Sequence, residues 1–293
     1  MNRASEPKWV LMIPFMSAPG FPLKESHAVT LGGFHAELRP AGFNYTEITI
    51  EGIESARAAY DLFEAMRVGL LVASLNLNSG IRVLPNASIL DFDSSMPNQP
   101  EVPLIYPEDK NLSRLVLHFG AVENNPDKTL PKLLESIEIG LSLEPARRAI
   151  SDDRVRLAVE LYIDSYFETS DSARFIGFVG VLEVLKDKDS SSDAAKALID
   201  RWRREALTLA DEEANSVRSS LGFLKSISIS RGIASVVKRH LGEDRSKEAR
   251  NLYTARSNLV HDGIRPVDSF DTMRRTQQIV RELLSHILTT GSR

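Results

Sequence analysis

The sequence predicts an α+β protein, in which a mixed α/β region over residues 1–145 precedes an all-helical region over residues 146–293. Short apolar runs bounded by Pro and Gly dominate the first region, as is typical of strands. Long runs with helical periodicity, separated by capping residues, dominate the second region. With 293 residues and a hydrophobic content of 42%, the chain can bury the core of one large domain or of two ordinary ones.

Three strands are expected first, over residues 8–16, 34–38 and 45–50, because each is an apolar or alternating run that Pro or Gly bounds. A helix is expected over residues 55–78, with Ser55 as its N-cap. The residues of its apolar face recur with the helical period, and they are Ala59, Leu62, Phe63, Met66, Leu70 and Ala73.

The rest of the first region is predicted to contain a loop, a fourth strand and a second helix. Residues 86–110 are rich in Pro, Asp, Ser and Asn, which favours a long loop. Residues 113–122 form an apolar run typical of a buried strand, and a helix is expected over residues 126–140. We place the boundary between the two regions near Glu144 and Pro145.

Six helices are expected in the second region. Polar capping clusters precede two of them, and Gly242 and Gly263 follow two others. The helix over residues 172–187 is apolar on almost all sides, so we expect it to lie at the centre of the bundle. Its Gly177 and Gly180 would allow a neighbouring element to approach closely. The predicted ranges are 147–168, 172–187, 192–221, 230–241, 244–261 and 269–290.

Composition points to the cytoplasm. The chain contains no Cys, which excludes disulfides, thiol catalysis and thiolate metal sites, and which fits a reducing compartment. The charged start and the early end of its first apolar run at Pro14 argue against a signal peptide. The longest hydrophobic stretch, residues 68–77, is too short to span a bilayer. We therefore expect a cytoplasmic protein without a membrane partner.

The charge is divided unevenly between the two regions. Residues 1–145 hold 11 Lys and Arg against 18 Asp and Glu, whereas residues 146–293 hold 25 against 22. The helical region is therefore the better candidate for contact with nucleic acid. Its excess of positive charge is small for a dedicated nucleic-acid binder, so we expect local and brief contact with RNA.

No motif indicates a cofactor or a metal. Gly32 and Gly33 lack the spacing of a dinucleotide or P-loop fingerprint. His35 and Glu37 have the spacing of part of a zinc-deaminase motif, but the cysteines of that motif are missing, so a position in a strand explains them. We expect neither a cofactor nor a bound metal.

Arg256 and His261 lie five residues apart at the end of a predicted helix, and this pair carries the most information about function. A guanidinium can hold a phosphodiester through two parallel hydrogen bonds, and an imidazole can move protons near neutral pH. Such a pair suits RNA cleavage without a metal. The alternative is a surface salt bridge together with a His that interacts with the helix dipole.

The same spacing recurs at Arg281 and His286, and about 0.5 copies would arise by chance in a chain of this composition. We interpret the second copy as coincidental, because it lies inside the final apolar-periodic helix. Gly263 directly follows the first copy and predicts that His261 lies in the last helical turn. On a regular helix, five residues separate two side chains by about 140° around the axis, so convergence on one phosphate requires the helix to end or Arg256 to reach around it.

At these residues the chain resembles the HEPN domains, most closely their Apea-like branch. Three features carry the resemblance: the run Tyr253–Gly263, the earlier helix Arg174–Leu185 and the order of helices between them. It covers residues 146–293, about half of the chain. The resemblance implies an all-helical domain that forms homodimers. In active members of the family, it implies a metal-independent ribonuclease whose Arg and His line a cleft at the dimer interface.

On this basis Arg256 is expected to bind the scissile phosphate, and His261 is expected to act as general base or general acid. The family often has Asn, Asp or His directly after the Arg, where this chain has Ser257 followed by Asn258. These two residues are expected to orient the backbone or the nucleotide. Lys238 and its neighbour Arg239 are weaker candidates for contact with RNA phosphates, and a solvated helix face is the alternative for them.

Glu183 is the acidic residue within the apolar helix over residues 172–187. A buried carboxylate is costly without a partner, so we expect a cationic or hydrogen-bonding side chain beside it. A structural ion pair unrelated to catalysis is the alternative to a supporting role at the site. The candidate partners are Arg256, Arg154, Arg156 and Arg174.

The sequence thus predicts an endoribonuclease with an RNA substrate. Many members of the family it resembles are toxins or defence effectors against phage, which implies such a role here. The region over residues 1–145 would sense a trigger or inhibitor, or restrain the nuclease. The alternative is a non-catalytic helical dimer that binds a nucleotide, RNA or a protein partner.

Overall fold

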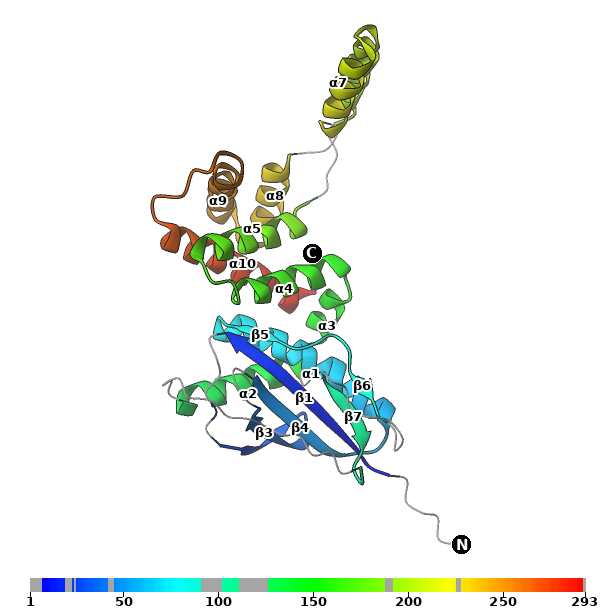
Figure 1. Cartoon of the computed structure of the whole chain (residues 1–293), viewed down its shortest axis with the longest axis vertical. Coiled ribbons are helices and arrows are strands. Elements are labelled where there is room, and N and C mark those ends of the chain that lie inside the picture. Colours follow the sequence, from blue (N-terminus) through cyan, green and yellow to red (C-terminus); the bar gives the residue numbers. More distant parts are fainter. Residues whose placement is uncertain are drawn as a thin grey trace.

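The computed structural model describes residues 7–18, 23, 25–41, 45–90, 102–110, 126–187, 192–224 and 228–291. Within these ranges the protein is α+β: a β-sheet in the first part of the chain precedes a helical bundle in the second (Figure 1). The strand predicted over residues 113–122 lies outside the described residues, and so does part of the loop predicted over residues 86–110.

The sheet is mostly antiparallel, and its main path runs in the order β2-β3-β4-β1-β7-β6, while β5 pairs with β1. The three strands predicted near the N-terminus are confirmed as β1, β3 and β4. Within the described residues the strands are β1 (Trp9–Ala18), β2 (His27–Leu31), β3 (Phe34–Pro40), β4 (Tyr45–Ile53), β5 (Gly80–Arg82), β6 (Ser88–Ile89) and β7 (Leu104–Pro107). His35 and Glu37 occupy exposed positions of β3, as expected for a strand.

β1 lies in the interior of the sheet and is buried on both faces. Leu11 and Ile13 point into the core beneath the helices, whereas Val10 and Met12 pack with Tyr106 on the opposite face. A strand that is covered on both faces has apolar residues at every position rather than at alternate ones. This explains the continuous apolar run in the sequence.

The prediction of a loop over residues 86–110 is wrong at β6 and β7, which are strands. β7 pairs with β1 in antiparallel register, Leu104 opposite Met12, and β6 pairs with β7 in parallel. β7 follows Pro103 and has Pro107 as its last residue, in a stretch whose composition is typical of a loop. Its assignment as a strand depends on pairing with β1, which local sequence does not reveal.

Two helices cover one face of the sheet, and both are confirmed predictions. α1 spans Ala56–Leu77; the Ser55 side chain accepts a hydrogen bond from the Ala58 backbone N–H at its start, and Asn78 ends it in the left-handed conformation. α2 spans Pro126–Ser142 and packs along α1. Figure 1 shows both helices between the sheet and the bundle.

α1 belongs to both hydrophobic cores. Its predicted apolar face packs on the sheet, with Phe63 and Met66 fully buried. Val68, Leu71 and Leu75 lie on a second apolar face and pack into the core of the helical bundle. The two parts of the chain therefore share a packed interface, and the boundary placed at Glu144 and Pro145 stays a prediction.

The helical part departs from the prediction at two breaks. The range 147–168 contains two helices, because the Asp152 carboxylate accepts from the backbone N–H groups of Arg154 and Val155 and starts a new one. The range 192–221 also contains two helices, since Leu209 is extended and three acidic residues open the second. The helices are α3 (Glu144–Ile150), α4 (Asp153–Ser165), α5 (Asp171–Leu185), α6 (Asp193–Glu205), α7 (Asp211–Phe223), α8 (Ile229–Leu241), α9 (Glu243–Asp262) and α10 (Ser269–Thr290), with a short 3-10 turn at Ala206–Thr208.

α5 lies at the centre of the bundle, as predicted, and contacts α4, α8, α9 and α10. Close approach at its glycines is confirmed only at Gly177, where a Cβ atom would lie 2.4 Å from the Ser165 Oγ. At Gly180 a Cβ atom would meet nothing within 4 Å, so the prediction of close approach there is wrong. This side of α5 is left open by the other described elements.

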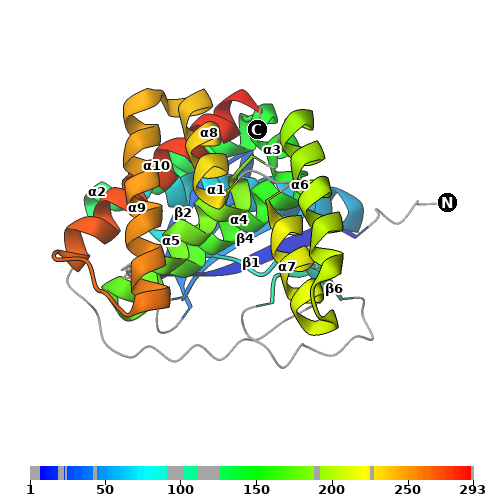
Figure 2. The same cartoon turned by 90° about the horizontal axis from the view of Figure 1, so that it is seen from above.

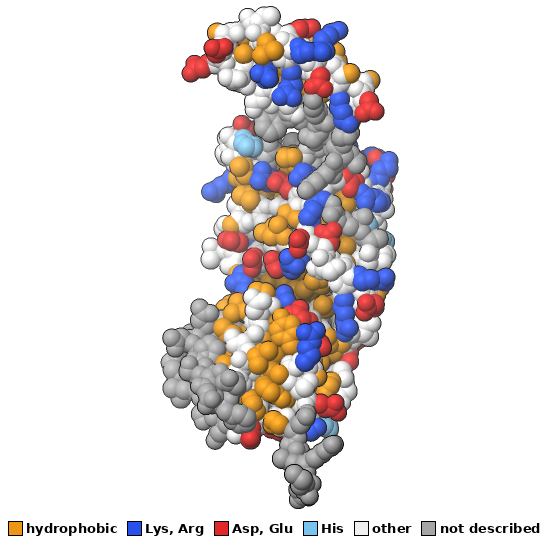
Figure 3. Space-filling model, turned by 90° about the vertical axis from the view of Figure 1, so that its right-hand side faces the viewer, with side chains coloured by type: hydrophobic (Ala, Val, Ile, Leu, Met, Phe, Trp, Pro, Cys, Tyr) orange, Lys and Arg blue, Asp and Glu red, His pale blue; other side chains and the backbone are white. Residues whose placement is uncertain are grey.

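α6 and α7 pack on each other as a hairpin that projects from the bundle. Figure 2 shows the two helices side by side, and Figure 3 shows them as a separate lobe at one end of the molecule. Lys and Arg side chains alternate with Asp and Glu over the face that Figure 3 presents, without a broad basic surface. No helix in the described part of the chain is both long and apolar enough to cross a membrane.

A hydrogen-bond network joins the sheet part to the bundle. The Gln277 side chain on α10 donates to the Asn78 Oδ1 at 3.1 Å and to the Tyr166 hydroxyl at 2.8 Å, and that hydroxyl also donates to Asn78 at 3.1 Å. Nearby, Arg82 of β5 forms an ion pair with Asp164 of α4 at 2.6 Å. These contacts hold α1, β5, α4 and α10 in one arrangement.

Candidate functional site

The Arg256–His261 stretch occupies the last two turns of α9. The helix continues to Asp262 and ends at Gly263, which has a φ of 69°. The backbone N–H groups of Gly263 and Ile264 both donate to the Asn258 carbonyl and close the helix end. The prediction that His261 lies in the last turn is therefore confirmed.

Arg256 faces Glu183 across the contact between α9 and α5. Its Nε lies 3.5 Å from the Glu183 Oε1, and the two side chains are 22% and 23% exposed. Among the candidate partners of Glu183, the structure thus selects Arg256. The others have different partners: Arg154 donates to the Val184 and Lys186 carbonyls, Arg156 pairs with Asp153, and Arg174 donates to the Glu168 carbonyl.

The pair is close enough for electrostatic attraction but is not hydrogen-bonded. Both the Arg256 Nε and the Glu183 Oε1 are buried atoms without a hydrogen-bond partner. Because the two facing atoms are buried, the cost of removing their charges from water offsets part of the attraction between them. The carboxylate attracts the guanidinium, whose N–H groups can donate hydrogen bonds to an anion.

Tyr253 is a neighbour of this ion pair that the sequence analysis missed. Burial raises the pKa of its hydroxyl, and the Glu183 carboxylate adds to the rise, while Arg256 opposes it. The signal in the sequence is its spacing, since Tyr253 precedes Arg256 by three residues and shares its side of the helix.

His261 is exposed and makes no hydrogen bond or ion pair with another described residue. Because α9 stays regular to Asp262, the side chains of Arg256 and His261 diverge by about 140° around its axis. Within one chain the structure does not bring the two residues together. Arg256 points toward α5, and His261 points away from that contact.

Ser257 and Asn258, the residues expected to support the site, lie in the last two turns of α9. Ser257 is partly buried, and the side chain of Asn258 is exposed. The Asn258 main-chain carbonyl caps the helix, a role that any residue at this position would fill. The orientation of a nucleotide by either side chain stays a prediction.

Lys238 and Arg239 lie at the other end of α9. Both residues lie in the last turn of α8, which ends at Leu241, and Gly242 alone connects α8 to α9. Because α9 is about 27 Å long from its first residue to His261, the two cations lie far from His261. Lys238 pairs with Glu243 at 2.6 Å, and Arg239 pairs with Asp187. The structure therefore does not gather these cations with Arg256 and His261.

Four exposed apolar residues lie along the chain between the last turn of α9 and the first turn of α10. Val260 is 45% exposed, Ile264 is 60% exposed and Phe270, in the first turn of α10, is 60% exposed. Val267, in the connection between the two helices, is fully exposed. Where such residues form one contiguous patch, they commonly mark a contact surface. We call these four residues the α9–α10 rim.

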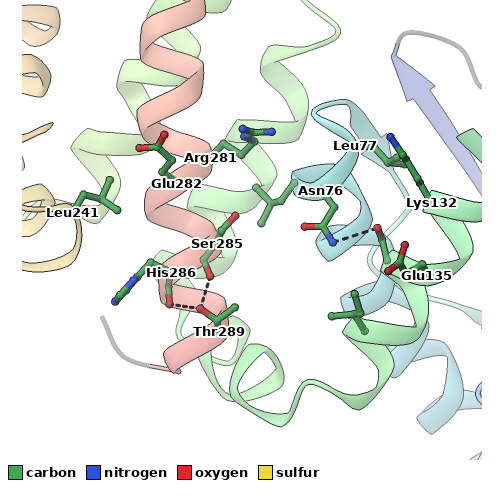
Figure 4. A pocket seen from close by; sticks show the side chains of 13 residues that line it. Asn76, Leu77, Lys132, Glu135, Leu241, Arg281, Glu282, Ser285, His286 and Thr289 are labelled. Atoms are coloured by element: carbon green, nitrogen blue, oxygen red, sulfur yellow. Dashed lines mark hydrogen bonds between the residues drawn. The ribbon is translucent and has the colours of Figure 1, made fainter.

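The second Arg-x4-His copy lies in α10 beside a pocket of about 680 Å³. Arg281 and His286 both line it, together with residues from the end of α1 and from α2 (Figure 4). The guanidinium of Arg281 lies on the side of α10 that faces Asn76, whereas the His286 ring points to the other side of the helix (Figure 4). The His286 ring also makes an edge contact with His240, at 5.2 Å between centroids.

Among the described residues, no three His, Asp or Glu side chains gather as metal ligands would. Comparisons with family models, with curated proteins and with solved structures found no match for this chain.

Proposed function

We propose that the protein is a cytoplasmic, metal-independent endoribonuclease of the HEPN type that acts as a toxin-like or phage-defence effector. The observation that carries this proposal is the arrangement at the end of α9. A guanidinium is held beside a carboxylate on one side of the helix, and an uncommitted imidazole lies one and a half turns further on. A cation and a titratable base are the two groups that RNA cleavage by the 2′-hydroxyl requires.

The divergence of Arg256 and His261 within one chain favours a site composed from two chains. The α9–α10 rim is apolar and borders His261, and the side of α5 at Gly180 is open. A second copy that docks on this surface about a two-fold axis would place two α9 ends against each other. The Arg256 of one copy would then lie near the His261 of the other.

The proposed reaction is a transesterification followed by release of the downstream fragment. The ribose 2′-oxygen attacks phosphorus, the bond from phosphorus to the 5′-oxygen breaks, and a 2′,3′-cyclic phosphate remains on the upstream fragment. His261 accepts the 2′-hydroxyl proton or donates a proton to the departing 5′-oxygen. Arg256 stabilises the negative charge that develops on the phosphoryl oxygens, and Glu183 positions Arg256.

The sheet part would supply regulation. α1 contributes to both cores, and the network of Asn78, Tyr166 and Gln277 connects it to α4 and α10. A trigger or inhibitor that changes the packing of the sheet part would therefore act on the bundle through elements that already touch it. This coupling supports a sensing role for the first 145 residues.

Expression in bacteria tests the function directly. The wild type should arrest growth and degrade cellular RNA, and Arg256→Ala and His261→Ala should each restore growth at equal protein levels. Arg148→Ala serves as a matched control, since Arg148 is exposed on α3 and belongs to no part of the proposed site. Growth arrest that persists in both site variants would leave the non-catalytic helical dimer as the better explanation.

We predict that the full chain is a homodimer whose contact includes the α9–α10 rim. Phe270→Asp should give a monomeric mass in light scattering at micromolar concentration, where the wild type gives the mass of two chains. The new carboxylate lies in the first turn of α10, where the helix dipole favours it, so the variant should stay folded. Ile89→Asp, at a 52% exposed residue of β6, should leave the dimer intact. A monomeric wild type contradicts the composite site.

A further inference from the structure

The pocket beside α10 lies at the junction between the sheet part and the bundle. Its walls come from the C-terminal end of α1, from α2, from the end of α8 and from α10 (Figure 4). Its volume of about 680 Å³ is within the range of about 300–1,000 Å³ that is typical of small-molecule sites. The pocket is separate from the proposed nuclease site at the other end of α9.

Two cations line this pocket from opposite walls without a partner among the described residues. Arg281 comes from α10 and Lys132 from α2, and neither forms an ion pair or a side-chain hydrogen bond with another described residue. Two other pockets at the same junction differ, because every Arg that lines them is engaged: Arg67 by Glu64, Arg82 by Asp164, Arg147 by the Leu141 carbonyl and Arg156 by Asp153.

The carboxylates of the pocket do not cancel this charge. Glu282 is already neutralised, since its Oε1 accepts from Arg245 at 2.8 Å and from Gln278 at 2.9 Å. Glu135 is the other carboxylate in the wall. Lys132 and Arg281 therefore outweigh the acidic groups that remain, and the pocket favours an anion.

The rest of the lining is suited to an apolar group. Ile139 of α2 is 43% exposed in the pocket wall, and Leu77 and Leu241 also line it. The Ser285 hydroxyl lies between these walls and has no side-chain hydrogen bond to a described residue. We propose that this pocket binds a small phosphate monoester with an apolar part, of the class of a ribonucleoside monophosphate. Arg281 and Lys132 hold the phosphate, and the aliphatic side chains contact the base.

The position of Arg281 connects such a ligand to the junction. Burial raises the pKa of the Tyr166 hydroxyl, and hydrogen bonds from Tyr162 and Gln277, together with the nearby Arg281 cation, oppose the rise. The same hydroxyl is bonded to Asn78 and Gln277. A phosphate on Arg281 thus changes the charge beside the network that joins the two parts of the chain. A role in regulation rests on the proposed nuclease function, whereas binding does not.

Calorimetric titration of the full-length protein tests the site. Each of the four ribonucleoside 5′-monophosphates is titrated separately. Inorganic phosphate and adenosine are titrated as controls, because they are the two parts of adenosine monophosphate. At least one nucleotide should bind more tightly than either half. Arg281→Gln and Lys132→Gln should each weaken that affinity by about 10-fold or more, as expected for loss of a charge-assisted contact.

Arg148→Gln, at an exposed residue of α3 outside the pocket, should leave the affinity unchanged. Lys132 is exposed, so its substitution keeps the test valid if Arg281→Gln fails to fold. The site is refuted if no nucleotide binds at about 1 mM, or if both variants retain the wild-type affinity. A protein that binds a nucleotide without cleaving RNA contradicts the nuclease and leaves the pocket in place.

Discussion

Replacing His261 by Ala should slow RNA cleavage by at least about 100-fold, the usual effect of removing a positioned acid or base. The melting temperature of the variant should stay near that of the wild type. His261 is exposed in the last turn of α9, so its side chain contributes to no core, and its interaction with the helix dipole is small. A large effect on activity without an effect on stability distinguishes a chemical role from a structural one.

The products identify the mechanism. If the 2′-hydroxyl attacks the phosphate, the upstream fragment carries a 2′,3′-cyclic phosphate, and a 2′-deoxy nucleotide at the cut blocks cleavage. If Arg256 and His261 carry the chemistry, cleavage continues in EDTA, because neither group requires a metal. Mass spectrometry of a short oligonucleotide and of its 2′-deoxy analogue measures both expectations in one experiment.

His35→Ala is the matched control, since His35 is an exposed residue of β3 in the other part of the chain. This variant should cleave at the wild-type rate. Loss of activity in EDTA, or a folded His261→Ala protein that cleaves normally, would contradict the mechanism.

Features that local sequence determines were predicted closely, whereas features that depend on contacts between distant residues were not. α1 and α10 were predicted closely, because their apolar periods are local signals, as is the cap of α1 at Ser55. β7 was missed, since these four residues, which follow Pro103 and end at Pro107, become a strand only by pairing with β1. The break between α3 and α4 was also missed, although Asp152 is a good N-cap, because the apolar period continues across it.

At the candidate site, too, the local features were predicted and the features that depend on tertiary contacts were not. Gly263 predicted the end of α9 and thereby the place of His261, because a helix stop is a local signal. The partner of Glu183 depends on which helices touch, so the sequence left four Arg residues open and the packing of α9 on α5 selected Arg256. In the proposed dimer, Arg256 and His261 would converge only across two chains, and no pattern within one chain indicates such a contact.

The packing of α1 on α2 was not predicted from the sequence either. This packing depends on two glycines, Gly69 and Gly140. A Cβ atom at residue 140 would lie 2.5 Å from the Cα of Gly69 and 3.0 Å from its N. A Cβ atom at residue 69 would lie 2.9 Å from the Ile137 carbonyl oxygen. All these neighbours are backbone atoms, so no rotamer change can make room for a methyl group. The two helices approach this closely because both residues lack a side chain.

Gly140→Ala should therefore destabilise the protein by about 1–3 kcal/mol, the usual cost of an extra methyl group in a packed interior. Helix propensity alone favours Ala over Gly by about 1 kcal/mol, so a helix without the close contact would change in the opposite direction. Gly222→Ala in α7 supplies that comparison, because a Cβ atom there meets nothing within 4 Å. Thermal melts of the two variants should shift in opposite directions from the wild type, with Gly140→Ala lower by several degrees. A Gly140→Ala melt at or above the wild type would mean that α1 and α2 do not pack backbone to backbone, and that the wall of the pocket formed by α2 lies elsewhere.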